Sequence, residues 1–358
     1  FIGIGGIGMS AIARYYHRKG FKVSGYDKTP SPLTAALEEE GIEVHYEDNT
    51  DFIPKDVEST LVVYTPAIPK DMGELVYVQE KGYRVIKRSR TLGEITRGQR
   101  CMAVAGTHGK TTTSTLVSHI FTDTGEGCSA FLGGISKNYD SNLLIDQNDV
   151  VVVEADEFDR SFLQLFPEVA VITSMDADHL DIYGDEAHIR EAFKAYASQV
   201  SGTVIVKHGL DITSDDTKAE IRTYGFGKPE ADFYAEPLED GHFNLHYPGG
   251  VIEDCVVGIP GWVNVENATG AAAIALTYGI APEKIKKALA NFSGVKRRFD
   301  IQVKKPGCVY IDDYAHHPEE ITAALSSIRR SYPDSRLTAV FQPHLYTRTR
   351  DFAPEFAQ

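Results

Sequence analysis

The sequence has 358 residues, of which 42% are hydrophobic and 24% charged, so it can fill the cores of two or three domains rather than one. Its formal net charge of −15 argues against a nucleic acid or an anionic membrane as a partner, because both require a basic surface. The cysteines are too scattered for a disulfide framework, and no apolar run is long enough to span a bilayer, which favours a cytoplasmic protein with reduced thiols.

The first segment, residues 1–97, has the pattern of a Rossmann-like domain. Its glycine motif, Gly3, Gly5 and Gly8, leads into an expected helix, and Asp27 ends the next strand about where a dinucleotide fold places its ribose-binding acid. The motif indicates a nucleotide site without identifying the nucleotide. We expect helices at 9–18, 33–40 and 89–94, strands at 21–26, 43–46, 60–64 and 84–87, and a linker at 97–100.

The stretch 101–113 predicts a phosphate-binding loop between a strand and a helix. Gly106-Thr107-His108-Gly109 separates an apolar run from a threonine-rich helix, so backbone N–H groups would converge on an anion at the helix N-terminus. Lys110 would reach the β- and γ-phosphates of a nucleotide, and the Thr111 hydroxyl would bind Mg²⁺. The motif is shortened, because Val104 stands where the full pattern has glycine. A glycine-rich turn with an incidental lysine is the alternative.

Acidic residues follow two further strands that are expected to be buried. The valines at 150–153 lead to Glu154, which would lie at the carboxyl edge of the sheet and bind Mg²⁺ directly or through water. The strand at 169–173 leads to a cluster of aspartates around His179, a set of residues typical of metal or phosphate sites. A solvated acidic loop and a purely structural histidine are the respective alternatives.

The rest of the chain continues the α/β pattern. We expect helices at 186–198, 260–278, 282–291 and 319–330, and strands at 203–207, 309–311 and 337–341. Short alternating runs over 221–258 predict antiparallel strands at the sheet edge. The sequence opens inside a motif and ends within a third βαβ unit, so we expect only the first half of a third domain.

Several motifs, taken in order over essentially the whole chain, resemble the bacterial Mur ligases. They are Gly3 to Ser10, Gly106 to Thr111, Glu154-Ala155-Asp156-Glu157, Asp178-His179, Asp313 to Glu319 and Phe341-Gln342-Pro343-His344. The resemblance implies a three-domain α/β architecture. Residues 1–97 would form a Rossmann-like domain for a UDP-sugar, 98–294 a central P-loop ATPase domain, and 295–358 the first half of a Rossmann-like domain for an amino acid.

The resemblance also implies an activity in peptidoglycan precursor synthesis. The enzyme would join L-alanine to the lactyl carboxylate of UDP-N-acetylmuramic acid through an acyl phosphate, using ATP and Mg²⁺, with two metal ions. A ligase that attaches an intact tripeptide to the same UDP-sugar is an alternative within the family. An NAD-dependent oxidoreductase and a nucleotide-gated binding module are alternatives from other classes, and the oxidoreductase would leave Lys110, Glu154 and His179 without a role.

The site residues follow by matching the family motifs. Metal ligands would be Thr111 and Glu154 for one ion and His179 for the other, and the catalytic residues would be Lys110, Glu154, His179 and Arg348. ATP would contact Gly106, Thr107, His108, Gly109, Lys110, Thr111, Thr112, Asn264, Asn267 and His344. The other substrates would contact Gly5, Gly6, Ile7, Asp27, Thr65, His108, Arg298, Tyr314 and Arg348. Val263 replaces the usual histidine beside Asn264, and Phe193 aligns with the carbamylated lysine of later-acting relatives, so we expect no carbamate.

Overall fold

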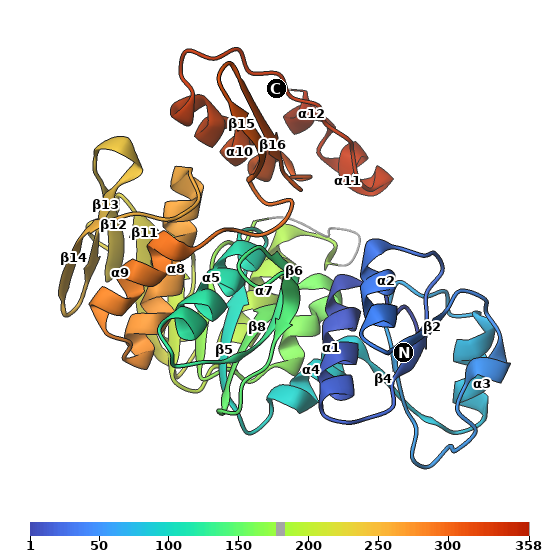
Figure 1. Ribbon diagram of the computed structural model, residues 1–358. Helices are drawn as coiled ribbons and strands as arrows, with labels where there is room; N and C mark the ends of the chain where they lie inside the picture. The colour runs from blue at the N-terminus through green and yellow to red at the C-terminus, as the bar shows by residue number, and fades with distance from the viewer. Residues whose placement is uncertain (177–182, 358) are drawn as a thin grey trace.

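The computed structural model describes residues 1–176 and 183–357 and divides into three α/β parts that follow one another along the chain (Figure 1). A ten-stranded sheet forms the middle part, and two-stranded ladders occur in the first and third parts. No helix of the described chain has both the length and the apolar character needed to cross a bilayer.

The first part is a doubly wound parallel sheet with Ile2 in its middle. Strand β1 pairs with β2 and β3 pairs with β4, while Ile2 bridges to Tyr26 of β1 and to Tyr64 of β3. Across the sheet the order is therefore β2, β1, the Ile2 segment, β3 and β4. This is the Rossmann order, 3-2-1-4-5, when the Ile2 segment is counted as the first strand of the chain. The glycine loop after Ile2 lies at the point where this order reverses. The helices and strands are α1 (Ile7–Arg18), β1 (Ser24–Tyr26), α2 (Pro32–Glu39), β2 (Glu43–His45), η1 (Thr50–Phe52), β3 (Leu61–Tyr64), α3 (Gly73–Glu80), β4 (Arg84–Lys87) and α4 (Arg88–Thr96).

The middle part is organised around β5, which pairs in parallel with β8 on one side and β9 on the other. The valines of β8 alternate between the two faces, with Val150 and Val152 in one apolar core and Val151 and Val153 in the other, as expected for a strand covered on both sides. Its strands are β5 (Arg100–Ala105), β6 (Ser129–Ser136), β7 (Ser141–Leu144), β8 (Val150–Ala155), β9 (Val169–Ile172), β10 (Thr203–Lys207), β11 (Glu220–Phe226), β12 (Phe233–Pro237), β13 (Phe243–Tyr247) and β14 (Gly250–Cys255). Its helices are α5 (Lys110–Asp123), η2 (Phe158–Gln164), α7 (Glu186–Ala197), η3 (Glu239–Gly241), α8 (Trp262–Tyr278) and α9 (Pro282–Asn291).

The prediction of antiparallel strands over 221–258 is partly wrong. Strand β11 pairs in parallel with β10, and β12 pairs in parallel with β11, whereas the pairs β12–β13 and β13–β14 are antiparallel. The segment 208–219 between β10 and β11 is long enough to return the chain to the same end of the sheet, which a tight hairpin could not do. Strand β11 therefore stays parallel to β10.

The third part is a β-hairpin with helices beside it. Strand β15 (Asp300–Lys305) pairs antiparallel with β16 (Cys308–Asp312), followed by α10 (Pro318–Ser331), α11 (Tyr346–Asp351) and α12 (Ala353–Phe356). The predicted strand at 337–341 is not formed, and the βαβ unit expected there is wrong for the described chain. An apolar run becomes a strand only where its backbone groups find a ladder partner, and Val340 lies 97% exposed without one.

Candidate active site

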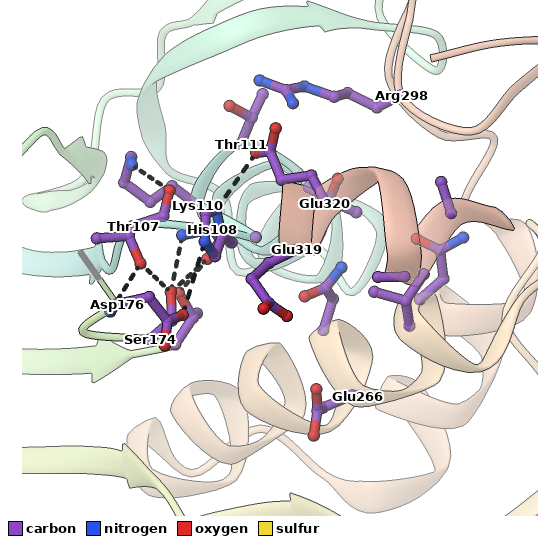
Figure 2. Close-up of a pocket in the computed structure, with 18 of the residues that line it drawn as sticks. Thr107, His108, Lys110, Thr111, Ser174, Asp176, Glu266, Arg298, Glu319 and Glu320 are labelled. Atoms are coloured by element: carbon purple, nitrogen blue, oxygen red, sulfur yellow. Dashed lines mark hydrogen bonds and ion pairs between the residues drawn. The ribbon is translucent and has the colours of Figure 1, made fainter. Parts of the chain in front are cut away.

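The phosphate loop is fixed by hydrogen bonds to the residues that follow the neighbouring strand β9. Gly106 has φ 137°, and a Cβ there would lie 2.0 Å from the Thr173 hydroxyl, so only glycine fits. His108 N–H donates to the Ser174 hydroxyl at 2.7 Å, and the Thr173 hydroxyl donates to the His108 carbonyl. These bonds fix the loop before α5 begins (Figure 2).

Lys110, the first residue of α5, lies folded against this loop. Its ammonium donates to the carbonyl of Gly106 at 2.6 Å and pairs with Glu157 at 2.8 Å. Burial alone would lower the pKa of Lys110, but the carboxylates of Glu157, Asp156 and Glu154 outweigh it and raise that pKa. Burial raises the pKa of Glu157 to about 7, although Lys110 opposes the shift. Lys110 is therefore a charged group inside an acidic pocket.

Glu154 and Thr111 face each other at the carboxyl edge of the sheet. The Thr111 hydroxyl donates to one carboxylate oxygen of Glu154 at 3.1 Å, and Gly133 N–H donates to the other at 3.2 Å. A Cβ at Gly133 would lie 2.2 Å from that second oxygen, so the glycine makes room for the carboxylate. Burial raises the pKa of Glu154; the charge of Lys110 opposes this shift and that of Asp156 adds to it.

A first cavity of about 340 Å³ lies between the phosphate loop, α8 and the third part. Of the predicted ATP contacts, Gly106 and His344 are not on its wall, and His344 is exposed on the third part. The others do line it: Thr107, His108, Gly109, Lys110, Thr111, Thr112, Asn264 and Asn267. Val263, which replaces the family histidine, lines it too.

Helix α10 brings acidic residues to this cavity that sequence reasoning missed. Glu320 accepts hydrogen bonds from the N–H groups of His316 at 3.0 Å and His317 at 3.3 Å, and its carboxylate lies 3.5 Å from His108 Nδ1. Burial opposes ionisation, but the adjacent imidazoles of His108 and His316 and the hydrogen bond from His316 N–H hold the pKa of Glu320 well below its usual range. Figure 2 shows Glu319 and Glu320 at the start of α10, beside the loop. The glutamate three residues into a helix was a usable capping signal.

A second cavity of about 290 Å³ lies between the glycine loop of the first part and the middle part. Gly6, Ile7 and Thr65 line it as predicted. Gly5 and Asp27 do not, because Asp27 accepts a hydrogen bond from Gly5 N–H at 2.7 Å and so fastens the loop from behind. The predicted direct contact of Asp27 with substrate is not supported by this placement.

Arg88 supplies a cation to the second cavity that was not predicted. It pairs with Asp156 at 3.1 Å, and a Cβ at Gly8 would lie 2.6 Å from its guanidinium. The third glycine of the motif therefore gives Arg88 its room. Four residues line both cavities and form a shared wall, which we define as Thr111, Glu154, Asp156 and Arg298.

Other predicted residues are not brought to these cavities. Tyr314 stacks under the guanidinium of Arg298 at 5.2 Å but is not on either wall, and neither is Arg348, which is buried in α11. His179 lies outside the described residues. Phe193 is buried against Phe162 at 5.2 Å between ring centres.

Comparisons with known proteins cover the whole chain. Residues 1–100 match the model described as Mur ligase family, catalytic domain; residues 104–275 match the Mur ligase middle domain; residues 297–358 match the Mur ligase, glutamate ligase domain. The UDP-N-acetylmuramate–L-alanine ligase of Flavobacterium psychrophilum is 52% identical over 366 residues, which cover 100% of this chain and 80% of the relative. That of Porphyromonas gingivalis is 50% identical over 369 residues, covering 100% and 81%.

Solved structures show the same architecture. The UDP-N-acetylmuramate-alanine ligase of Thermotoga maritima superposes with a TM-score of 0.84 at 28% identity, covering 98% of this chain and 82% of that one. A murein peptide ligase of Psychrobacter arcticus superposes with a TM-score of 0.76 at 24% identity, covering 96% and 78%, and shows a shared fold. From the matched models and the identity over its entire length, the chain belongs to the Mur ligase family.

Proposed function

We propose that this chain is an ATP-dependent ligase of the bacterial cytoplasm that joins L-alanine to the lactyl carboxylate of UDP-N-acetylmuramic acid. The observation that carries the proposal is the shared wall. A nucleotide phosphate on the loop and an acid held by the glycine loop would meet at Thr111, Glu154, Asp156 and Arg298. A site that only bound a nucleotide would not need a second cavity at the same wall.

The chemistry explains why the two cavities must meet. A carboxylate is a poor acyl donor, so one of its oxygens first attacks the γ-phosphorus of ATP, which gives an acyl phosphate and ADP. The amine nitrogen then attacks the acyl carbon and loses a proton, and inorganic phosphate leaves. The first step brings two anions together, and the first cavity is lined by the cations Lys110, Lys207 and Arg298, of which Arg298 also belongs to the shared wall.

The residues present fit a divalent cation. The Thr111 hydroxyl and the Glu154 carboxylate lie 3.1 Å apart, and oxygen donors are what Mg²⁺ prefers. Within the described chain, no group of three or more His, Cys, Asp or Glu side chains could hold a metal. Thr111 and Glu154 would therefore share the ion with phosphate oxygens and water, as is usual for Mg²⁺ in phosphoryl-transfer sites. When bound, the ion neutralises phosphate charge. We propose His179 as a ligand of a second ion.

The proposal is tested by phosphate release from ATP by the full-length protein. Release should require both UDP-N-acetylmuramic acid and an amine, and L-alanine should be preferred over glycine, L-serine and the tripeptide L-alanyl-γ-D-glutamyl-meso-diaminopimelate. Release without the UDP-sugar would contradict a ligase, and preference for the tripeptide would assign the recycling reaction instead.

Glu157→Gln should tighten ATP binding by roughly two- to five-fold. Glu157 pairs with the Lys110 ammonium at 2.8 Å and so competes with a phosphate for the same charge. Calorimetric titration of ATP into wild type and variant measures the change, and weaker binding in the variant would show that Glu157 supports the nucleotide site instead.

A further inference from the structure

Asn142 of β7 is a fully buried amide whose side-chain partners all belong to helix α1 of the first part. Its amide nitrogen donates to the Ile7 carbonyl at 2.6 Å and to the Ser10 hydroxyl at 3.0 Å. Its oxygen accepts from the guanidinium of Arg14 at 2.6 Å. The side chain has no exposed surface. None of this was visible in the sequence, because Asn142 lies far from α1 along the chain and matches no motif.

These bonds specify how α1 sits on the middle part. A buried amide is costly unless its donors and its acceptor are matched, and here each faces a group of the opposite kind. An apolar side chain of similar size could pack against α1 with the helix in several rotations about its axis. The hydrogen bonds of Asn142 are satisfied in one of these rotations. Arg14 extends the network, because it also pairs with Glu40 at 2.7 Å, next to the end of α2.

The network acts directly on the second cavity. Ile7, whose carbonyl Asn142 holds, lines that cavity together with Gly6 and Gly8. The strand paired with β7 is β6, which supplies the Gly133 N–H that holds Glu154 at 3.2 Å. The hairpin formed by β6 and β7 therefore contacts both helix α1, which follows the glycine loop, and the shared wall. Figure 1 shows α1 at this side of the middle part.

We propose that Asn142 is a positioning residue that fixes the glycine loop, and with it the bound UDP-sugar, relative to the shared wall. The inference rests on the proposed function, because it concerns where the carboxylate of the UDP-sugar meets the γ-phosphate of ATP. Asn142 lines neither cavity, so its effect passes through Ile7 and α1. A misplacement of about 1 Å between reacting groups costs roughly 10²-fold in rate.

The test compares Asn142→Leu with Asn138→Leu. Asn138 lies in the turn of the same hairpin. Its side-chain nitrogen donates to the Asn291 carbonyl at 2.9 Å, and its side-chain oxygen accepts from Ser293 N–H at 2.8 Å, both within the middle part. We expect Asn142→Leu to lower kcat/KM for the UDP-sugar roughly 10- to 100-fold. The KM for ATP should stay within about two-fold, and Asn138→Leu should change neither value by more than that. Thermal unfolding of both variants reports any loss of stability.

The outcomes separate the inference from the function. If wild type releases no phosphate with UDP-sugar and L-alanine, the proposed function fails. If wild type is active but Asn142→Leu raises both KM values equally, or behaves like Asn138→Leu, the positioning role alone is overturned. Should Asn142→Leu not fold, Ser10→Ala removes one acceptor of the network and should lower kcat/KM for the UDP-sugar a few-fold. An unchanged kcat/KM for the UDP-sugar in Ser10→Ala would then reject the role.

Discussion

Lys110→Ala is expected to lower kcat by roughly 10³-fold or more while UDP-sugar affinity stays within about two-fold. Negative charge builds up between the carboxylate and the γ-phosphate while the phosphoryl group moves, and Lys110 is the cation folded against the phosphate loop. Its removal also leaves Glu157, Asp156 and Glu154 without the charge that offsets them. Steady-state phosphate release gives kcat, and calorimetry gives the affinity for the UDP-sugar, whose proposed site, the second cavity, Lys110 does not line.

The matched control is Lys194→Ala. Lys194 also has carboxylate partners, Asp211 at 3.1 Å and Asp216 at 3.4 Å, but it lines neither cavity. The Lys194→Ala substitution removes the same side chain and the same charge, but from α7. A fall in kcat seen only in Lys110→Ala therefore locates the effect on the phosphate loop. Turnover near that of wild type in Lys110→Ala would contradict the assignment of this loop to phosphoryl transfer.

The parts of the fold that the sequence predicted well are those fixed by local pattern. The apolar run before Gly106 and the threonine-rich run after Lys110 are confirmed as β5 and α5, and the four valines after Asp149 are confirmed as β8. Helix α9 begins at Pro282 as expected, because proline suits the first turn of a helix. For such elements, the period of apolar residues and the glycine or proline at the element ends are sufficient for prediction, and distant contacts are not needed.

Elements that depend on distant partners were missed or wrongly placed. Strands β6 and β7 contain glycine and polar residues, and they become strands because β6 joins β8 and β7 joins β6. Strand β15 reads as a polar segment and forms through its hairpin with β16. The run 337–341 shows the opposite case, since its apolar pattern is present but its partner is not.

The site follows the same division. Lys110, Thr111 and Glu154 could be predicted, because each belongs to a motif whose spacing reflects its chemistry. Arg88 and Asn142 could not, since each acquires its role from residues far along the chain, and Glu157 was part of a motif but its pairing with Lys110 was not predicted. The pairing of Arg88 with Asp156, at 3.1 Å, exists only because α4 and the end of β8 meet in space. One sequence can reveal the groups that do chemistry, but seldom the groups that place them.

Glu154→Gln is expected to raise the Mg²⁺ concentration for half-maximal activity by roughly ten-fold or more and to lower kcat by about 10²-fold at saturating metal. The substitution keeps the shape of the side chain, and one amide oxygen can still accept a hydrogen bond from Thr111 or from Gly133, but not from both. The amide has no charge and only one oxygen for a hard cation. A Mg²⁺ titration of phosphate release at fixed ATP measures both effects.

Glu168→Gln is the control for the lost charge, because Glu168 pairs with Arg100 at 2.7 Å away from both cavities. The two variants have the same net charge, so a general electrostatic effect on nucleotide binding would appear in both. A shifted Mg²⁺ requirement in Glu154→Gln alone assigns the ion to the end of β8. If its Mg²⁺ titration matches that of wild type while kcat falls, Glu154 acts on the phosphate loop through Thr111 instead, and the cation must be held by other residues.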